Sequence, residues 1–265
     1  MKLCMMSCMM QGAAPENIVR AAVECGMDAI DWVCSRRYAP AKQLRKLSED
    51  NGLKIVAHTN LDAAFENRDP NALDDFKHSL EFAVDLGAPV MMFPPFPRRN
   101  QVSMEDDRKA WIGFYAQAQP LAQAAGIILT VESTGLINSP ITTTAETLEV
   151  LQAVPGLMCT LDAGNMETAE PAVNAYTALK DYVVQFHLKD WKIYDTPVEN
   201  SDLKRCGKYF ANAVIGEGDL DLKAFWDTVD ARGRELYVNL ETTDFARTSS
   251  ATAVLKKTAD RLRNW

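Results

Sequence analysis

Four side chains that can bind a divalent metal ion stand at the ends of four successive apolar segments. These residues are Glu132 in "LTVES", Asp162 in "TLDAGN", His187 in "QFHLKD" and Glu241 in "VNLETT". Three carboxylates brought together would repel one another strongly unless a cation lay between them. Three oxygen donors and one imidazole suit Mn²⁺, Mg²⁺ or Co²⁺, with Zn²⁺ as an alternative, and we expect Mn²⁺. The pattern therefore predicts one bound divalent metal ion.

Each of these residues alone has an ordinary structural explanation. A glutamate at a strand end often caps a helix or forms a salt bridge, and a histidine near a core is often a hydrogen-bonded structural residue. Asp162 before Ala-Gly could simply form a turn. The metal site depends on the combination, in which all four residues occupy matching positions along the chain.

A repeated pattern explains how these positions could come together. A helical segment ends at a glycine, where a left-handed residue would terminate the helix, and a short segment rich in Val, Ile, Leu and Met follows. Such segments are typical of strands buried on both faces of a parallel sheet. The glycines are Gly26, Gly52, Gly87, Gly126, Gly156 and Gly233.

Signals for helix starts lie between the apolar segments. Pro15, Pro40 and Pro70 suit first turns, and "SMED" from Ser103 resembles a capping box. With the N-terminal "KLCMMSC" and with "VVQFHLK", the apolar segments give eight predicted strands. They lie near residues 2–8, 28–34, 54–60, 89–94, 127–132, 158–162, 183–189 and 236–241.

Eight βα units in 265 residues fit an α/β fold of one domain, a closed (β/α)8 TIM barrel over residues 1–265. The carboxyl ends of its strands converge on one mouth, so we expect the metal site at the ends of strands five to eight. A doubly wound sheet is the alternative, but no glycine-rich fingerprint follows the first strand. The long connection from Trp191 to Asp219 is expected to be a functional lid or a packing arm.

Composition narrows the partners and the compartment. The formal net charge is −8, which disfavours nucleic acid as a ligand. The six cysteines are scattered without a CxxC pair, as in a reduced protein, so a zinc cluster or a disulfide framework is the weaker reading. No stretch is apolar for long enough to span a membrane, and we expect a cytoplasmic protein. Whether the chain forms a homo-oligomer stays open.

The chain resembles the xylose-isomerase-like TIM-barrel superfamily of sugar (phosphate) isomerases and epimerases. The resemblance spans nearly the whole chain and is carried by the Glu of "VES", by "LDAGN", by "HLKD", by "GEGDLD" from Gly216 to Asp221, and by the terminal "LET". It implies that the four residues hold one divalent metal. It also implies that Glu132 and Glu241 face each other across a carbohydrate substrate.

The resemblance further implies a proton transfer next to a carbonyl group. One glutamate would remove the proton and the other would return it, while the metal stabilises the enediolate between these steps. Return to the opposite face gives epimerisation, and return to the neighbouring carbon gives isomerisation. Loss of a β-hydroxyl group gives dehydration instead. The four residues do not choose among these outcomes.

One residue departs from the ketose 3-epimerase branch of the superfamily. Those enzymes commonly carry a histidine three residues after the aspartate of strand six, and here Asn165 stands there. An amide can hydrogen-bond a substrate hydroxyl group but cannot shuttle a proton at neutral pH. Further candidates for substrate contacts are His58 in "VAHTN", Lys189, Trp191 and Arg205, and Arg98 and Arg99 are candidates for a phosphate contact.

The sequence supports one leading function and three alternatives. The leading function is a metal-dependent isomerase or epimerase acting on a keto sugar or a related polyol. A lyase of the inosose-dehydratase or dehydroshikimate-dehydratase kind is the first alternative. An endonuclease with a three-zinc cluster is disfavoured by three histidines and the negative charge. A degenerate barrel that only binds a ligand or a partner is disfavoured because all four metal-binding side chains are present.

Overall fold

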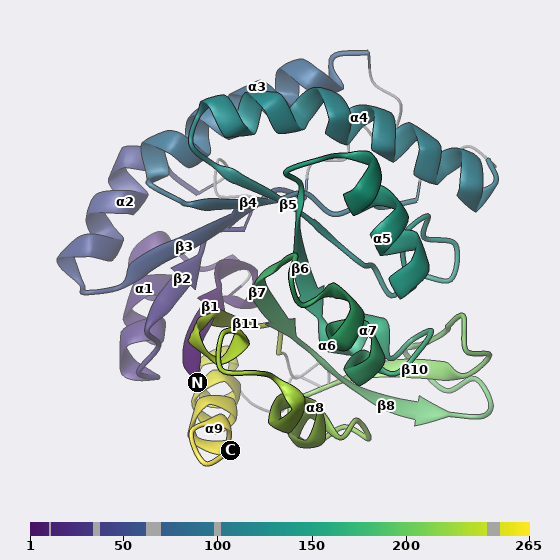
Figure 1. Cartoon of the computed structure of the whole chain (residues 1–265). Helices are drawn as coiled ribbons and strands as arrows, with labels where there is room; N and C mark the ends of the chain where they lie inside the picture. The colour runs from purple at the N-terminus through teal and green to yellow at the C-terminus, as the bar shows by residue number, and fades with distance from the viewer. Residues whose placement is uncertain (11, 34–37, 62–69, 98–101, 243–249) are drawn as a thin grey trace.

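Eight parallel strands close into a barrel with helices around it (Figure 1). The computed structural model describes residues 1–10, 12–33, 38–61, 70–97, 102–242 and 250–265. The strand order around the barrel is β1-β11-β7-β6-β5-β4-β3-β2, which confirms the predicted (β/α)8 fold. The strands are β1 (Lys2–Met6), β2 (Ala29–Asp31), β3 (Lys54–Thr59), β4 (Val90–Met92), β5 (Ile128–Glu132), β6 (Met158–Asp162), β7 (Val183–Leu188) and β11 (Tyr237–Leu240).

Each predicted apolar segment contains one barrel strand, but several strands are shorter than their segments. β1 stops at Met6 because Ser7–Met10 forms the 3-10 helix η1. β4 has only three residues, and it is soon followed by Pro94 and Pro95, which have no N–H group to donate to a neighbouring strand. Cys34, at the end of the second predicted strand, lies outside the described residues.

The helices begin at or just after the signals in the sequence, since Pro40 and Pro70 lie one and two residues before the helices that they were predicted to start. Pro15 is the first residue of α1, and the Ser103 side chain accepts a hydrogen bond from the Asp106 N–H at the start of α4. Within the described residues, no helix has the length and apolar character needed to cross a membrane. The helices are α1 (Pro15–Glu24), α2 (Ala41–Asp50), α3 (Ala72–Leu86), α4 (Met104–Ala124), α5 (Thr144–Ala153), α6 (Ala163–Met166), α7 (Ala172–Leu179), α8 (Leu222–Thr228) and α9 (Ala251–Leu262).

Five of the six glycines in the repeat have the predicted left-handed conformation, and the sixth does not. Gly233 instead begins the short 3-10 helix η3 (Gly233–Glu235). A Cβ atom at Gly233 would lie 2.5 Å from the Tyr176 hydroxyl and 2.6 Å from a methyl group of Val229. The left-handed backbone predicted for Gly233 is therefore wrong, and close packing explains why a glycine stands at this position. The left-handed glycines are Gly26, Gly52, Gly87, Gly126 and Gly156.

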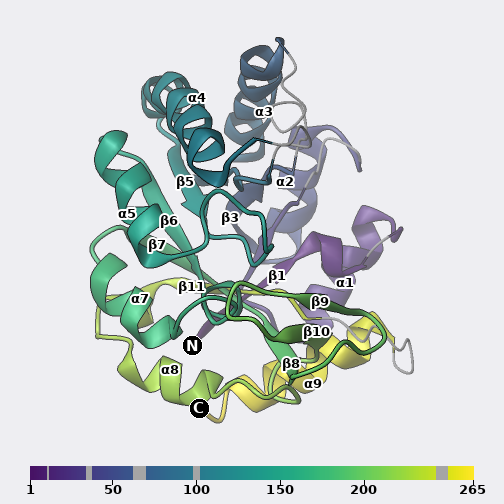
Figure 2. The same cartoon turned by 90° about the vertical axis from the view of Figure 1, so that its right-hand side faces the viewer.

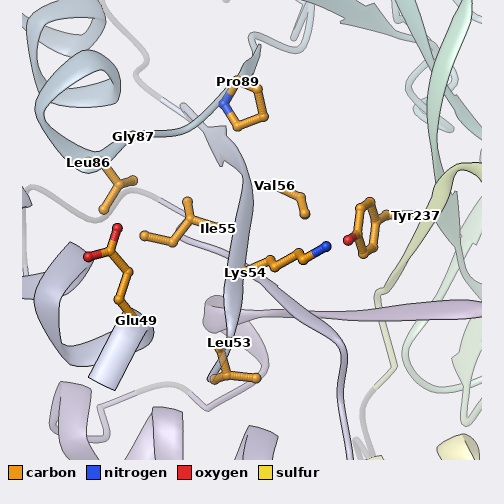
Figure 3. Close-up of a pocket in the computed structure, with 9 residues that line it drawn as sticks. All are labelled: Glu49, Leu53, Lys54, Ile55, Val56, Leu86, Gly87, Pro89 and Tyr237. Carbon is orange, nitrogen blue, oxygen red and sulfur yellow. The ribbon is translucent and has the colours of Figure 1, made fainter. Parts of the chain in front are cut away.

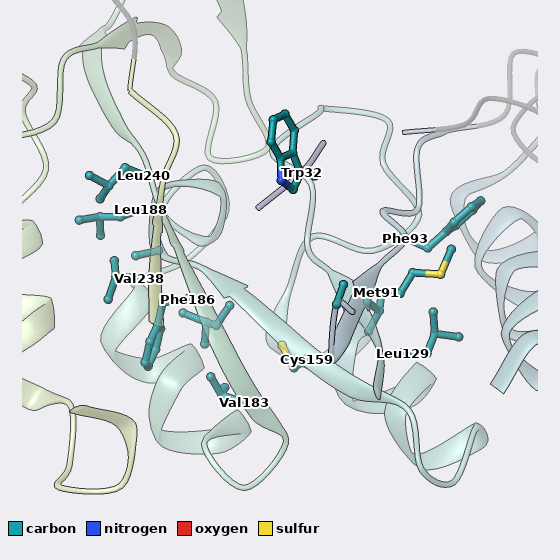
Figure 4. Packing of buried hydrophobic residues seen from close by; sticks show 14 of the residues in the cluster. Trp32, Met91, Phe93, Leu129, Cys159, Val183, Phe186, Leu188, Val238 and Leu240 are labelled. Carbon is teal, nitrogen blue, oxygen red and sulfur yellow. The ribbon is translucent and has the colours of Figure 1, made fainter. Parts of the chain in front are cut away.

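Alternation along β7 brings its polar side chains into the barrel. Phe186 points outward and packs against the rings of Tyr176 and Trp226, within the hydrophobic layer between strands and helices (Figure 4). Gln185 points inward and donates a hydrogen bond to the Thr160 hydroxyl on β6. His187 is two residues further along, so it shares the inward face at the carboxyl end of the strand.

The long connection after β7 folds into a sheet of its own, which Figure 1 shows as the green extension at the lower right. β8 (Asp190–Tyr194), β9 (Ser201–Leu203) and β10 (Tyr209–Ala213) pair antiparallel in the order β8-β10-β9. Figure 2 shows the three strands from the side. A turn at residues 204–208 joins β9 to β10, and the Lys204 N–H donates to the Lys208 carbonyl across it. We refer to residues 190–219 as the inserted sheet.

Two aspartates join the beginning and the end of the inserted sheet. The Asp190 carboxylate accepts hydrogen bonds from the Gly216 and Gly218 N–H groups, at 2.7 and 3.0 Å. Asp219 accepts from the Ile193 N–H at 2.8 Å and pairs with Lys192. The "GEGDLD" motif thus closes the insertion, and Asp221, its last residue, caps α8 through the Ala224 N–H.

Candidate metal centre and active-site cavity

A cavity of about 190 Å³ lies at the carboxyl ends of the barrel strands. Its wall contains six residues predicted from the sequence: Glu132, Asn165, His187, Lys189, Trp191 and Glu241. Most of the remaining wall is apolar and comes from Met6, Leu61, Met92, Phe96 and Leu136. The cavity therefore has a charged end at the strands and an apolar side.

Three of the predicted ligands form a compact, buried group. One ligand atom from each of Glu132, Asp162 and His187 lies within 4.8 Å of the other two. Their places follow from the parallel register, in which Asp162 is level with His187 on the neighbouring strand. The prediction of converging strand ends is confirmed for these three residues.

The polar atoms of this group match the requirements of a cation. His187 Nδ1 lies 2.7 Å from Glu132 Oε1. This contact is a charge pair that lacks hydrogen-bond geometry, and Asp162 Oδ2 likewise accepts no hydrogen bond among the described residues, although all three atoms are buried. Buried acceptors without partners are costly, whereas carboxylate oxygen and imidazole nitrogen are ordinary ligands of divalent metals. The group therefore fits the metal that the sequence predicts.

Glu241, the fourth predicted ligand, lies outside this compact group. Its Oε1 atom is 2.8 Å from Lys189 Nζ, and its side chain is 29% exposed. The same ammonium group lies 3.8 Å from Asp162 Oδ2. Glu241 thus faces the same cavity as the three buried ligands, but its charge is balanced by Lys189.

The pKa values in this cluster reflect crowded charge. Burial raises the pKa of Asp162 to about 7, and the nearby carboxylates of Glu132 and Glu241 add to the rise, while Lys189 opposes it. Burial lowers the pKa of His187, but the carboxylates of Glu132, Asp31 and Asp162 together raise it, so that it reaches about 9. A divalent cation would favour ionised carboxylates and a neutral imidazole here, which is the state that binds metal.

Asn165 and Trp191 border the ligands. The Asn165 N–H donates to Asp162 Oδ1, so Asp162 caps α6, and the Asn165 amide donates to the Ser133 carbonyl. Its Oδ1 atom accepts from Lys189 at 3.4 Å. The Trp191 indole donates to the Gly164 carbonyl, which fixes the ring in the cavity wall. Both residues are placed where a substrate could contact them.

His58 and Arg205 are not brought to the cavity. His58 is buried, with Nδ1 2.8 Å from the Trp32 carbonyl and Nε2 3.1 Å from the Ser79 hydroxyl, and it packs on Phe82. Arg205 pairs with Glu146 at the start of α5. The expectation of substrate contacts is therefore wrong for these two side chains, whose bonds are structural. Arg98 and Arg99 lie outside the described residues.

Replacing His58 by leucine is expected to weaken the fold and spare the metal site. The change leaves the buried Ser79 hydroxyl and Trp32 carbonyl without the ring, which should lower the free energy of unfolding by about 2–3 kcal/mol. Urea unfolding measures this loss, and calorimetry should find the affinity for Mn²⁺ unchanged. The control is His78→Leu, because His78 is exposed one residue before Ser79. A tenfold loss of metal affinity in His58→Leu would instead tie His58 to the site.

Three buried polar residues near the ligands were not predicted from the sequence. Asp31 accepts hydrogen bonds from the Thr59 N–H and hydroxyl and from the Asn239 amide. Asn239 lies 3.4 Å from His187 Nε2, behind the metal-facing side of the ring. Lys204, from the inserted sheet, lines the cavity. Asp31 could have been recognised as a charged residue inside the predicted strand near residues 28–34, but Lys204 lies in no predicted strand.

A larger hollow of about 400 Å³ lies at the opposite end of the barrel (Figure 3). It is lined by Lys54 and Tyr237, the first residues of β3 and β11, and by Pro89 just before β4. Its polar side chains do not form a ligand group like that of Glu132, Asp162 and His187. Since enzymes of this fold carry their chemistry at the carboxyl ends of the strands, the smaller cavity is the candidate active site.

Comparison with known families places the chain. The family model described as xylose isomerase-like TIM barrel matches residues 19–265. The chain belongs to this family. No match was found among curated proteins.

Solved structures similar to this member of the xylose isomerase-like family share its barrel over nearly the whole chain. The IOLI protein with a bound zinc atom has a TM-score of 0.80 at 17% identity, covering 99% of this chain and 96% of that one. The 3-keto-D-glucoside 4-epimerase YcjR from E. coli has a TM-score of 0.77 at 17% identity, covering 100% of both chains. The probable 3-DHS dehydratase AsbF from Bacillus anthracis has a TM-score of 0.75 at 17% identity, covering 100% of this chain and 99% of that one. At identities this low, the structural similarity establishes a shared fold and nothing more.

Proposed function

We propose that the protein is a divalent-metal-dependent isomerase or epimerase that moves a proton next to the carbonyl group of a keto sugar or a related polyol. The observation that carries this proposal is the buried group of Glu132, Asp162 and His187, whose facing atoms have no hydrogen-bond partner among the described residues. The E. coli epimerase with the same barrel supports a carbohydrate substrate. We propose Mn²⁺ as the metal, held by these three residues and by Glu241.

The two glutamates are the proposed acid and base. Glu241 is partly exposed to the cavity and Glu132 is buried beneath it, so a substrate lying between them has one carboxylate on each side. One removes the proton and the other returns it. A divalent metal held by Glu132, Asp162, His187 and Glu241 would supply positive charge next to the substrate carbonyl group.

Lys189, Asn165 and Trp191 are proposed to position these groups and the substrate. The Lys189 ammonium holds the Glu241 side chain in place through their 2.8 Å contact. The Asn165 amide can bind a substrate hydroxyl group without transferring a proton. The Trp191 ring offers an apolar face to the carbon skeleton.

The free thiols of the described cysteines fit the proposed cytoplasmic location.

Metal analysis followed by deuterium exchange tests the proposal. The purified protein is expected to hold about one Mn²⁺ per chain after reconstitution, as measured by elemental analysis. In D₂O, incubation with a panel of keto sugars and keto polyols should place deuterium on the carbon next to the carbonyl of the correct substrate, which mass spectrometry detects. The reference is the Asp162→Asn variant, which should show no exchange. Exchange that is equal in this variant would contradict the metal-dependent mechanism.

A dehydratase is the second candidate, and a specific observation favours it. Met6, Leu61, Met92, Phe96 and Leu136 make one side of the cavity apolar, which suits a substrate with few hydroxyl groups on that face. The similarity of the barrel to the probable 3-DHS dehydratase supports the same chemistry. Loss of a water molecule from the product, read as a decrease of 18 Da by mass spectrometry, would replace the isomerase by this lyase.

A further inference from the structure

Lys204, whose side chain is almost fully buried, places a positive charge in the cavity wall that the proposed reaction does not use. Its side chain is 3% exposed. Its Nζ atom lies 5.0 Å from the centre of the Trp191 ring, and Lys189 lies 5.4 Å from the same ring. Taking an ammonium group out of water costs free energy, and burial accordingly lowers the pKa of Lys204. A favourable interaction must offset this cost.

The nearest carboxylate offsets little of the free energy that Lys204 loses by leaving water. Asp202 Oδ2 lies 3.8 Å from Lys204 Nζ, too far for a hydrogen bond, and the Asp202 side chain is 79% exposed. Ion pairs with such an exposed partner contribute little. Within the described parts of the chain, Lys204 Nζ has no hydrogen-bond acceptor. The contact with Trp191 is favourable, but an apolar side chain could cover the same ring without the cost of burying a charge.

The turn that carries Lys204 is held firmly over the cavity. Arg205 donates to both carboxylate oxygens of Glu146, at 2.8 and 2.9 Å. The Cys206 N–H donates to the Thr168 carbonyl at 3.0 Å. These bonds join the turn to segments that follow β5 and β6. They fix the position of the Lys204 ammonium before any ligand binds, as a recognition group requires.

We propose that Lys204 binds a carboxylate group of the substrate, so that the substrate is a hydroxylated keto acid rather than a neutral sugar. This inference rests on the proposed function, since the carbonyl end of the same molecule would lie at Glu132 and Glu241. A carboxylate fits better than a phosphate, because the described lining residues include no arginine fork to hold a dianion. The apolar side of the cavity accommodates the carbon skeleton between the two ends.

Three unreactive probes with the same six-carbon polyol chain test the proposal. They are D-gluconate, which ends in a carboxylate, neutral sorbitol, and sorbitol 6-phosphate. Calorimetry measures their Kd with the Mn²⁺-loaded protein, so no turnover is required. We expect gluconate to bind the wild type about tenfold more tightly than sorbitol and also more tightly than sorbitol 6-phosphate. Lys204→Met should abolish the preference over sorbitol, and Lys204→Arg should retain it.

The matched control is Lys208→Met, at the other end of the same turn. Lys208 is half exposed and pairs with Asp195 on the surface, so the preference should persist in this variant. Equal binding of gluconate and sorbitol to the wild type, or absence of gluconate binding, would overturn the proposal. So would a preference that survives in Lys204→Met, or a stronger preference for sorbitol 6-phosphate.

The same titrations separate this inference from the proposed function. If the protein binds Mn²⁺ but shows no preference that depends on Lys204, the keto-acid substrate is excluded and the isomerase proposal stands. If the protein binds no Mn²⁺, the proposed function fails. The three probes are then titrated into the metal-free protein, where the comparison of wild type with Lys204→Met still decides the role of Lys204.

Discussion

Glu241→Gln is expected to abolish turnover while the protein still binds its metal ion. Glutamine has the shape of glutamate but cannot accept the substrate proton, so kcat should fall by about 10²–10⁴-fold. Glu241, the fourth proposed ligand, lies outside the compact group of Glu132, Asp162 and His187, and glutamine keeps an oxygen that can bind metal. Metal affinity should therefore decrease by no more than about tenfold, the equivalent of roughly 1.4 kcal/mol. Calorimetry with Mn²⁺ and a steady-state assay measure the two effects separately.

Glu132→Gln is the informative comparison for this prediction. Glu132 belongs to the compact group and is also a proposed acid or base, so this variant should lose both metal affinity and turnover. Glu217→Gln serves as the control, because Glu217 pairs with Lys257 and Arg261 at the surface. A Glu241→Gln protein that turns over at the wild-type rate would remove Glu241 from the mechanism.

The second large effect is expected in thermal stability when the metal is removed. A ligand present at 100 times its Kd stabilises the folded state by about 2.7 kcal/mol. In a protein of this size, that corresponds to a rise in Tm of about 5–10 °C. Treatment with a chelator should remove this increment, and Mn²⁺ should restore it, as followed by differential scanning calorimetry.

Asp162→Asn links this stabilisation to the proposed ligands. Asparagine can still accept the hydrogen bond from the Asn165 N–H that caps α6, so the fold should persist. The variant should lose the increase in Tm that Mn²⁺ gives. Asp219→Asn, in the inserted sheet, should keep that increase, since the Asp219 carboxylate bonds to Lys192 and to the Ile193 N–H within that sheet. A full Mn²⁺ response in Asp162→Asn would place the metal elsewhere.

The barrel and the convergence of Glu132, Asp162 and His187 could be predicted because their causes are local in the sequence. Parallel strands need apolar residues on both faces, and five of the six repeat glycines are required by a left-handed backbone. A ligand at the end of one strand is automatically near the ligand of the next, as the register of Asp162 and His187 illustrates. The sequence therefore predicts this part of the site well.

The other contacts could not be predicted because they depend on the direction of single side chains. His58 ends a strand as His187 does, yet its ring points toward Ser79 on α3 rather than into the barrel. Lys204 and Arg205 are neighbours in one turn, but of these two residues Lys204 lines the cavity and Arg205 pairs with Glu146. Their orientation is set by the pairing within the inserted sheet, which no apolar periodicity marks.

The hydrogen bonds that Asp190 and Asp219 make across the base of the inserted sheet have a consequence for evolution. These bonds hold the two ends of the insertion together, so that the chain leaves the barrel and returns to it at nearly the same place. Mutations, insertions and deletions between these two ends can accumulate without disturbing the barrel strands. Related proteins can thus acquire new preferences for the distal part of the substrate through changes in this insertion alone. The proposed metal ligands on the barrel strands would stay the same.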